Sequence, residues 1–213
     1  MYIDGGTLFT LRYSYSHRAH IGHNVKSRAQ ETRILYNRIS DEDGDPSYSI
    51  DIPQVGRTFI IGNLIQQGPN TANSTIVSYG AESAINGTQE LYVVNNTIVN
   101  DRPGGGAFFD IRGGTTARFI NNIFAGPGTV PTASALITMT TNLTFPVTSS
   151  AGLVDAAGFD YHLTVGSPAR NAGTDPGSAA SFSLTPTSQY LHPINRQDRP
   201  VDGMIDIGAY EFQ

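Results

Sequence analysis

The sequence predicts an all-β fold, a right-handed parallel β-helix, from three observations: a repeated Asn-centred segment, a second set of short strands, and little helical periodicity. The repeat reads TRILYNRIS, TFIIGNLIQ, LYVVNNTIV and ARFINNIFA, at 32–40, 58–66, 91–99 and 117–125. Its central residues are Asn37, Asn63, Asn96 and Asn122, which are 26, 33 and 26 residues apart. A weaker copy spans 11–19, with Ser16 in place of the Asn.

Each copy is short, rich in Ile, Val, Phe and Tyr, and bounded by turn residues, as is typical of strands. In a solenoid, coils stack about 4.8 Å apart and bury their apolar sides against each other. The recurring Asn suits a corner of such a coil, because Asn tolerates left-handed backbone and its amide can hydrogen-bond its copy in the next coil. We therefore expect the Asn residues to form structural ladders.

A second strand set lies at 2–4, 24–28, 49–52, 76–79 and 108–112. Alternation assigns one half of these residues to the interior, namely Ile3, Val25, Ile50, Ile52, Phe109 and Ile111. The coil around Tyr79 is ambiguous, since either Ile76 or Val77 could point inward. The outward half comprises Tyr2, Asp4, Asn24, Lys26, Arg28, Ser49, Asp51, Asp110 and Arg112. Stacked coils would gather this half into one charged and aromatic face suited to a long polymer.

Length and composition limit the remaining choices. The chain has 213 residues, which predicts a single domain, 1–213, with coils over 1–147 and a C-terminal coil and irregular cap over 148–213. We expect the cap to cover the open edge of the last coil. No comparable cap precedes Tyr2, which leaves the first coil available for a homo-oligomer. A net charge of −5 argues against nucleic acid, and no apolar run predicts membrane insertion.

Several segments resemble right-handed parallel β-helix proteins of the pectate lyase-like superfamily. They are YNRISDEDG (36–44), NNTIVN (95–100) and NNIFAG (121–126). DYHLTVGSPARNAG (160–173) and DIGAYEF (206–212) are similar to the closing segment of many bacterial secreted β-helix proteins. The resemblance implies a carbohydrate-active protein that is secreted or periplasmic. The resemblance is specific for the fold. It does not select one activity, because the superfamily contains lyases, hydrolases, esterases and non-catalytic adhesins.

A narrower resemblance lies in SYSHRAHIGHNVKSRA (14–29), which is similar to a stretch of uncharacterised bacterial β-helix proteins and, more weakly, to the chondroitinase B and alginate lyase family. That family uses a Lys in a Lys-Ser dipeptide as base and an Arg in the next coil as acid. Lys26-Ser27 matches the first element, whereas the next coil offers Asp51 in place of the Arg. Lys26 is also the only lysine among thirteen basic residues. Three roles stay open for it: a catalytic base, a contact to a substrate carboxylate, or a structural ion pair with Asp51.

The favoured function is a polysaccharide lyase that cleaves an acidic, uronic-acid polysaccharide by β-elimination. Lysine, arginine, histidine and tyrosine suit the neutralisation and proton transfers of that reaction. The predicted catalytic residues are Lys26, Arg28, His20 and Tyr79. The predicted substrate-binding residues are Asn24, Asp51, Glu82, Asp110 and Arg112. Packing is the alternative for Tyr79. Glu82 lies in a loop, 81–90, that projects from the solenoid.

Two further functions and one metal site remain open. A glycoside hydrolase would need two carboxylates that flank a sugar bond, for which Asp51 and Asp110 are available. A non-catalytic glycan-binding or surface module would bind without turnover. No cofactor is required, but the DEDGD run places Asp41, Asp43 and Asp45 around a glycine, which predicts a calcium site against the alternative of a solvated turn.

Overall fold

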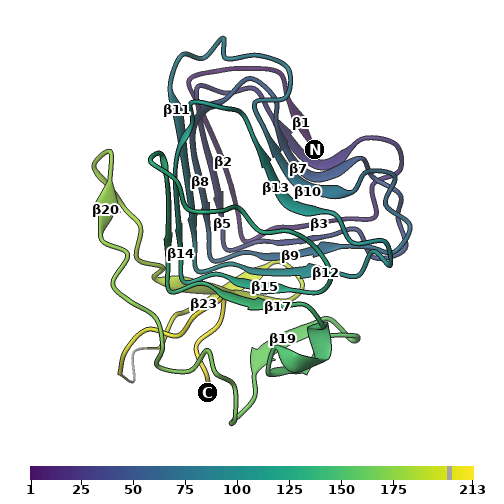
Figure 1. The fold of residues 1–213 in the computed structure, drawn as a ribbon, viewed down its shortest axis with the longest axis vertical. Helices are drawn as coiled ribbons and strands as arrows, with labels where there is room; N and C mark the ends of the chain where they lie inside the picture. The colour runs from purple at the N-terminus through teal and green to yellow at the C-terminus, as the bar shows by residue number, and fades with distance from the viewer. Residues whose placement is uncertain (201–202) are drawn as a thin grey trace.

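A computed structural model describes residues 1–200 and 203–213 and confirms the predicted class, an all-β parallel β-helix (Figure 1). Successive coils supply strands to three parallel sheets. Sheet A contains β1 (Tyr2–Ile3), β4 (His23–Ser27), β7 (Tyr48–Ile52), β10 (Thr75–Tyr79) and β13 (Ala107–Ile111). Sheet B contains β2 (Leu8–Arg12), β5 (Glu31–Leu35), β8 (Gly56–Ile61), β11 (Gln89–Val94), β14 (Thr116–Ile120) and β16 (Ile137–Thr140). Sheet C contains β3 (Tyr15–His17), β6 (Arg38–Ser40), β9 (Leu64–Gln67), β12 (Thr97–Asn100), β15 (Ile123–Ala125) and β17 (Leu143–Phe145).

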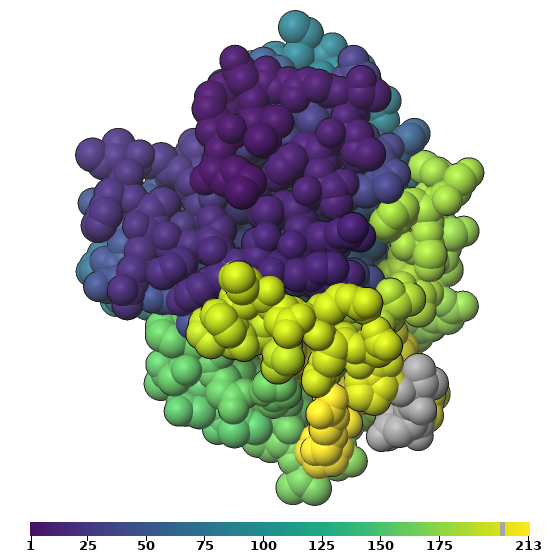
Figure 2. All heavy atoms as spheres, turned by 180° about the vertical axis from the view of Figure 1, so that it is seen from behind, coloured from purple at the N-terminus to yellow at the C-terminus, as the bar shows by residue number. Residues whose placement is uncertain are grey.

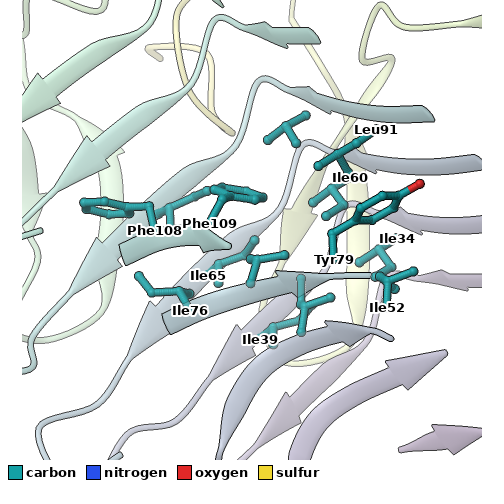
Figure 3. Close-up of a cluster of buried hydrophobic side chains, with 14 of the residues drawn as sticks. Ile34, Ile39, Ile52, Ile60, Ile65, Ile76, Tyr79, Leu91, Phe108 and Phe109 are labelled. Carbon is teal, nitrogen blue, oxygen red and sulfur yellow. The ribbon is translucent and has the colours of Figure 1, made fainter. Parts of the chain in front are cut away.

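Apolar side chains from all three sheets fill the interior of the solenoid (Figure 3). In sheet A, Val25, Ile50 and Phe109 stack in register as alternation predicts, and Val77 is the residue of the ambiguous coil that stacks with them. The alternation fails at the start of these strands, because Ile76 is buried together with Val77 in the same core. Asn24, Ser49 and Phe108, at the equivalent position in other coils, are buried as well. The expectation that Asn24 and Ser49 face outward is therefore wrong.

The Asn residues form the predicted ladder at the corner between sheets B and C. Each side-chain amide donates to the amide oxygen of the next, at 3.0 Å from Asn37 to Asn63, from Asn63 to Asn96 and from Asn96 to Asn122. The ladder continues to Asn142 at 2.8 Å, a residue outside the four copies of the sequence repeat.

Two details of that corner differ from expectation. The left-handed backbone belongs to the residue before each ladder position, as at Tyr36 (φ 56°) and Gly62 (φ 67°), and not to the Asn itself. In the first coil, Ser14 and not Ser16 occupies the Asn position, since its backbone N–H donates to Asn37 Oδ1 at 3.0 Å.

The C-terminal segment covers the outer sides of two sheets, B and C. It begins with the 3-10 turn η1 (Thr148–Ser150) and the strand pair β18 (Leu153–Asp155) and β19 (Asp160–Leu163). Two more antiparallel pairs follow, β20 (Ser178–Ala179) with β21 (Phe182–Ser183) and β22 (Ser188–Leu191) with β23 (Asn195–Asp198). Figure 2 shows the yellow C-terminal residues against the purple N-terminal coil.

The packing of this segment is apolar. Leu184 and Phe182 join the outward side chains of sheet B, including Phe59, in one cluster. Tyr161 and Tyr190 join the outward side chains of sheet C, including Leu64, in another. The outer side of sheet A receives no such apolar cover from the described part of the segment. No helix among the described residues is long and apolar enough to cross a membrane.

Candidate functional site

The outer side of sheet A, hereafter the open face, carries the predicted column of polar side chains. The strand register aligns Tyr2 with Lys26, Lys26 with Asp51, Asp51 with Ser78, and Ser78 with Asp110. Residues 24 or more positions apart thus become vertical neighbours, as the solenoid predicted. The register also places Lys26 directly beside Asp51, as stacked coils require.

Lys26 lies at the centre of an ion-pair network. Its Nζ is 2.8 Å from Asp51 Oδ2 and 3.1 Å from Glu82 Oε1, and its side chain is 15% exposed. Burial alone lowers the pKa of Lys26, but its hydrogen bonds to the two carboxylates more than offset this and raise the pKa above its ordinary value. Lys26 is therefore an ammonium group at neutral pH, and the neutral amine that could accept a proton is rarer than in free lysine. We refer to Asp4, His23, Lys26, Arg28, Asp51 and Glu82 as the Lys26 network.

Arg28 holds the same carboxylate as Lys26. Its Nε donates to Glu82 Oε2 at 3.1 Å and its Nη2 donates to Glu82 Oε1 at 2.7 Å, a two-pronged contact. Nη1 donates to Asp4 Oδ1 at 3.0 Å, and the Tyr2 ring lies 5.2 Å from the guanidinium carbon. The bonds from Arg28 and Lys26 lower the pKa of Glu82. Glu82 is thus held as a carboxylate between two cations.

The loop after β10 brings Glu82 to the network from a distant part of the sequence. Glu82 and Ser83 donate backbone N–H bonds to the Pro53 carbonyl, at 2.9 and 3.0 Å. Asn86 then fixes the loop by donating through its side-chain amide to the carbonyls of Arg28, Ala29 and Val55, at 3.2 to 3.3 Å. The loop thus brings the Glu82 carboxylate to β4, and the role of Glu82 in substrate binding stays a prediction.

Asp51 is the most buried carboxylate of the network, at 3% exposure. Its Oδ2 accepts from Lys26 and lies 3.4 Å from His23 Nε2, whereas Oδ1 has no hydrogen-bond partner among the described residues. Ser78, its neighbour in register on β10, is fully buried, and its Oγ also has no partner within 1–200 and 203–213. Two buried polar atoms on adjacent strands are thus available to a further partner.

The histidine that reaches this network is His23, whereas His20 was predicted. His20 instead pairs with Asp45 at 2.6 Å. His23 stacks on Tyr48 with ring centroids 5.3 Å apart, and its Nδ1 accepts the Tyr48 backbone N–H at 3.3 Å. Burial lowers the pKa of His23, although Asp51 acts in the opposite direction. The broken alternation at the start of β4 explains the error, because it turns His23 to the outer side.

Two other predicted site residues lie away from the open face. Tyr79 points into the core, where its hydroxyl donates to the Gly56 carbonyl at 2.5 Å, and burial raises its pKa. The packing interpretation therefore describes Tyr79. Asn24 is 1% exposed and donates to Asp41 at 2.6 Å, so substrate contact through Asn24 is corrected to a structural bond.

Asp110 and Arg112 lie on β13 and at its end, on the same face as Asp51. Asp110 is exposed, and Arg112 donates to the Gly80 carbonyl at 3.1 Å. Asp110 is separated from Asp51 by the whole strand β10, so the two carboxylates of the hydrolase hypothesis are two strands apart. Both residues extend the open face beyond the Lys26 network without joining it.

The DEDGD run does not gather its side chains. Asp41 is buried and accepts from Asn24, Ser49 and the Gly68 backbone, and burial raises its pKa to about 7. Asp43 pairs with Arg18 at 2.9 Å, and Asp45 pairs with His20. Over the described residues, no group of three or more His, Cys, Asp or Glu side chains is positioned to hold a metal ion.

The fold and the site together define a parallel β-helix protein with an ion-pair network on sheet A, to which the described part of the C-terminal segment gives no apolar cover. Comparison with protein-family models, curated proteins and solved structures finds no match for this chain. The class therefore rests on strand pairing, and function has to be argued from the site itself.

Proposed function

We propose that this protein binds an acidic polysaccharide along the open face and cleaves it by β-elimination, as a lyase of the pectate lyase-like superfamily. One observation carries the proposal: Lys26 and Arg28 together already bind a carboxylate, that of Glu82. A uronic-acid residue presents the same group, and a stacked-strand face is long enough to hold several sugars. Such substrates lie outside the cell, so the proposal includes a secreted or periplasmic, bacterial protein.

Lys26 acts in this proposal as a cation. Its pKa is raised, so it retains its proton and cannot remove one from sugar C5. A positive charge against the uronate carboxylate stabilises the enolate-like charge that develops when the C5 proton leaves to a water molecule. The C4–O bond then breaks, and the departing glycosidic oxygen takes a proton from solvent. Arg28, whose pronged contact fits a carboxylate, orients the same group. Of the two substrate roles open for Lys26, these contacts support carboxylate neutralisation over a base, and the ion pair with Asp51 is present beside it.

A second candidate is a glycan-binding module without turnover. Its support is that the charged groups of the Lys26 network are already paired, with the pKa of Lys26 raised and that of Glu82 lowered. Both shifts move these groups away from proton transfer at neutral pH. Such a face would still hydrogen-bond sugars.

One panel separates these functions. The protein is incubated with alginate, pectate and glycosaminoglycans, and unsaturated product is followed by ultraviolet absorbance. A lyase gives absorbance, a hydrolase gives reducing ends alone, and a binding module is retained on polysaccharide gels and gives neither.

The role of Lys26 is tested with a matched pair of variants. We expect Lys26→Ala to lose about 10²-fold or more of the lyase rate, as is usual when a stabilising charge is removed. Arg12→Ala, which removes an exposed cation from sheet B, should keep it. Full unsaturated-product formation by Lys26→Ala would remove the proposal.

A further inference from the structure

Glu82 binds two cations and is nevertheless open to solvent. Its carboxylate takes up donors of both Lys26 and Arg28, yet its side chain is 44% exposed. Ion pairs that reach the solvent contribute little net stability, so their partners exchange at small cost. The carboxylate of Glu82 is therefore replaceable by another carboxylate of the same geometry.

The charge of the network decides whether a second carboxylate can bind without that exchange. Asp4, Asp51 and Glu82 carry three negative charges against the two positive charges of Lys26 and Arg28. An added uronate would meet like charges at short range, which disfavours binding. If it replaces Glu82, the local charge is unchanged.

A second observation, independent of Glu82, points to a ligand at the same place. Asp51 Oδ1 and Ser78 Oγ are buried and unpartnered among the described residues, and the two residues are in register on β7 and β10. One atom is an acceptor and the other both donates and accepts. A sugar hydroxyl has both capacities and satisfies the pair. Lys26 Nζ links this pair to Glu82, because it contacts Asp51 Oδ2 as well as Glu82 Oε1.

We infer that Glu82 occupies the position of a substrate carboxylate and is exchanged for it when a uronic-acid chain binds. The incoming carboxylate takes the donors of Lys26 and Arg28. With Glu82 displaced, a free hydroxyl of the same chain hydrogen-bonds Asp51 Oδ1 and Ser78 Oγ. This inference rests on the proposed function and names its substrate unit: a uronate that retains a free hydroxyl.

An internal competitor lowers the apparent affinity of a ligand, because the ligand can bind only during the fraction of time that the site is free. If Glu82 holds it about nine-tenths of the time, its neutralisation raises the affinity about tenfold. The chain offers a matched control, because Asp198 is 87% exposed, lies in the C-terminal segment and carries the same charge.

The experiment measures binding of hexameric oligogalacturonate, oligoalginate and chondroitin, with carboxyl-reduced hexamers as neutral ligands, by titration calorimetry. Wild type, Glu82→Gln, Ser78→Ala and Asp198→Asn are compared after their far-ultraviolet circular dichroism shows a native fold. We expect Glu82→Gln to bind one acidic hexamer about tenfold more tightly and the neutral hexamer unchanged. Ser78→Ala should bind about fivefold more weakly, the effect of one hydrogen bond.

The other outcomes separate the exchange of Glu82, the hydroxyl contact and the proposed function. Binding by wild type that Glu82→Gln fails to strengthen, or that Asp198→Asn strengthens equally, overturns the exchange and leaves the proposed function standing. An unchanged affinity in Ser78→Ala overturns the hydroxyl contact. If neither wild type nor Glu82→Gln binds any acidic hexamer, the inference and the proposed function fall together.

Discussion

All three sheets are built from the same kind of short parallel strand, but their outer sides differ. The C-terminal segment packs on the outer sides of sheets B and C, whereas the outer side of sheet A carries charged residues. Sheets B and C present apolar residues such as Phe59 and Leu64, and the C-terminal segment packs on them. Sheet A presents Lys26, Arg28 and Asp51, which pair with each other and with Glu82. The difference shows that the outward side chains of a sheet, and not the coil itself, decide whether another segment packs on that sheet or leaves it open to a ligand.

The forces on the two sides differ in kind. Apolar burial stabilises by about 25 cal/mol for each Å² removed from water and hardly depends on salt. The ion pairs of the open face act between partly exposed groups, so salt screens them and their net contribution is small. We therefore expect the covered sides to determine stability and the open face to determine binding.

The largest expected effect comes from an apolar deletion on a covered side. Phe59 is fully buried and packs between Tyr92 and Phe182, with ring centroids 5.0 and 4.7 Å away. Phe59→Ala should lower the free energy of unfolding by about 4 kcal/mol, from lost burial and the cavity that remains. Urea denaturation followed by circular dichroism measures it.

Tyr2, an aromatic residue on the open face, is the control for that variant. It is 53% exposed, so Tyr2→Ala should cost less than about 1 kcal/mol. Similar losses in both variants would show that the two sides are equally important for stability, and the comparison would fail.

A ladder variant addresses the corner that joins the two covered sheets. Asn96 Oδ1 accepts from the backbone N–H and the side-chain amide of Asn63, and its own amide donates to Ile60, Val94 and Asn122. Asn96→Ala leaves several buried groups unpaired, so we expect a loss of about 3 kcal/mol in the free energy of unfolding.

Asn70→Ala is the control for the ladder, because Asn70 is exposed and makes a single bond, to the Asp43 carbonyl. We expect that variant to stay within about 0.5 kcal/mol of wild type. A loss below about 1 kcal/mol in Asn96→Ala would mean that the ladder is not a principal source of stability.

Local pattern predicted the parts of this molecule that repeat. The Asn spacing gave the coils, and strand alternation then placed Lys26 beside Asp51, which the structure shows at 2.8 Å. Asn142 escaped detection because it follows Asn122 by 20 residues, a shorter interval than the other copies have. The period of the repeat thus predicts which strands stack in each sheet, although a repeat copy in a shorter coil does not show this period.

The remaining site features depend on geometry that no local pattern contains. Glu82 meets Lys26 across 56 residues, through a loop whose path is set by its bonds to Pro53 and to the carbonyls that Asn86 holds. His23, and not His20, reaches the Lys26 network, because the inward–outward alternation of side chains fails at the start of β4. The packing of the C-terminal segment on the outer sides of sheets B and C was not predicted, because the sequence of an apolar segment does not state which apolar residues it covers.

The smallest expected effect is a shift in the pKa of Lys26, which tests whether the ion pairs of the open face hold this residue charged. Because Lys26 is the only lysine, its ε-carbon gives one lysine signal in a ¹³C NMR titration. Its pKa is raised by Asp51 and Glu82, so the signal should titrate above the ordinary lysine value, and Glu82→Gln should lower the midpoint. A group with a raised pKa stabilises the fold below its unfolded pKa and loses that contribution as the pH rises through the folded value. The open face should therefore weaken only in strongly alkaline solution. A midpoint at or below the ordinary lysine value would mean that the carboxylates do not hold Lys26 as an ammonium, and would return it to consideration as a base.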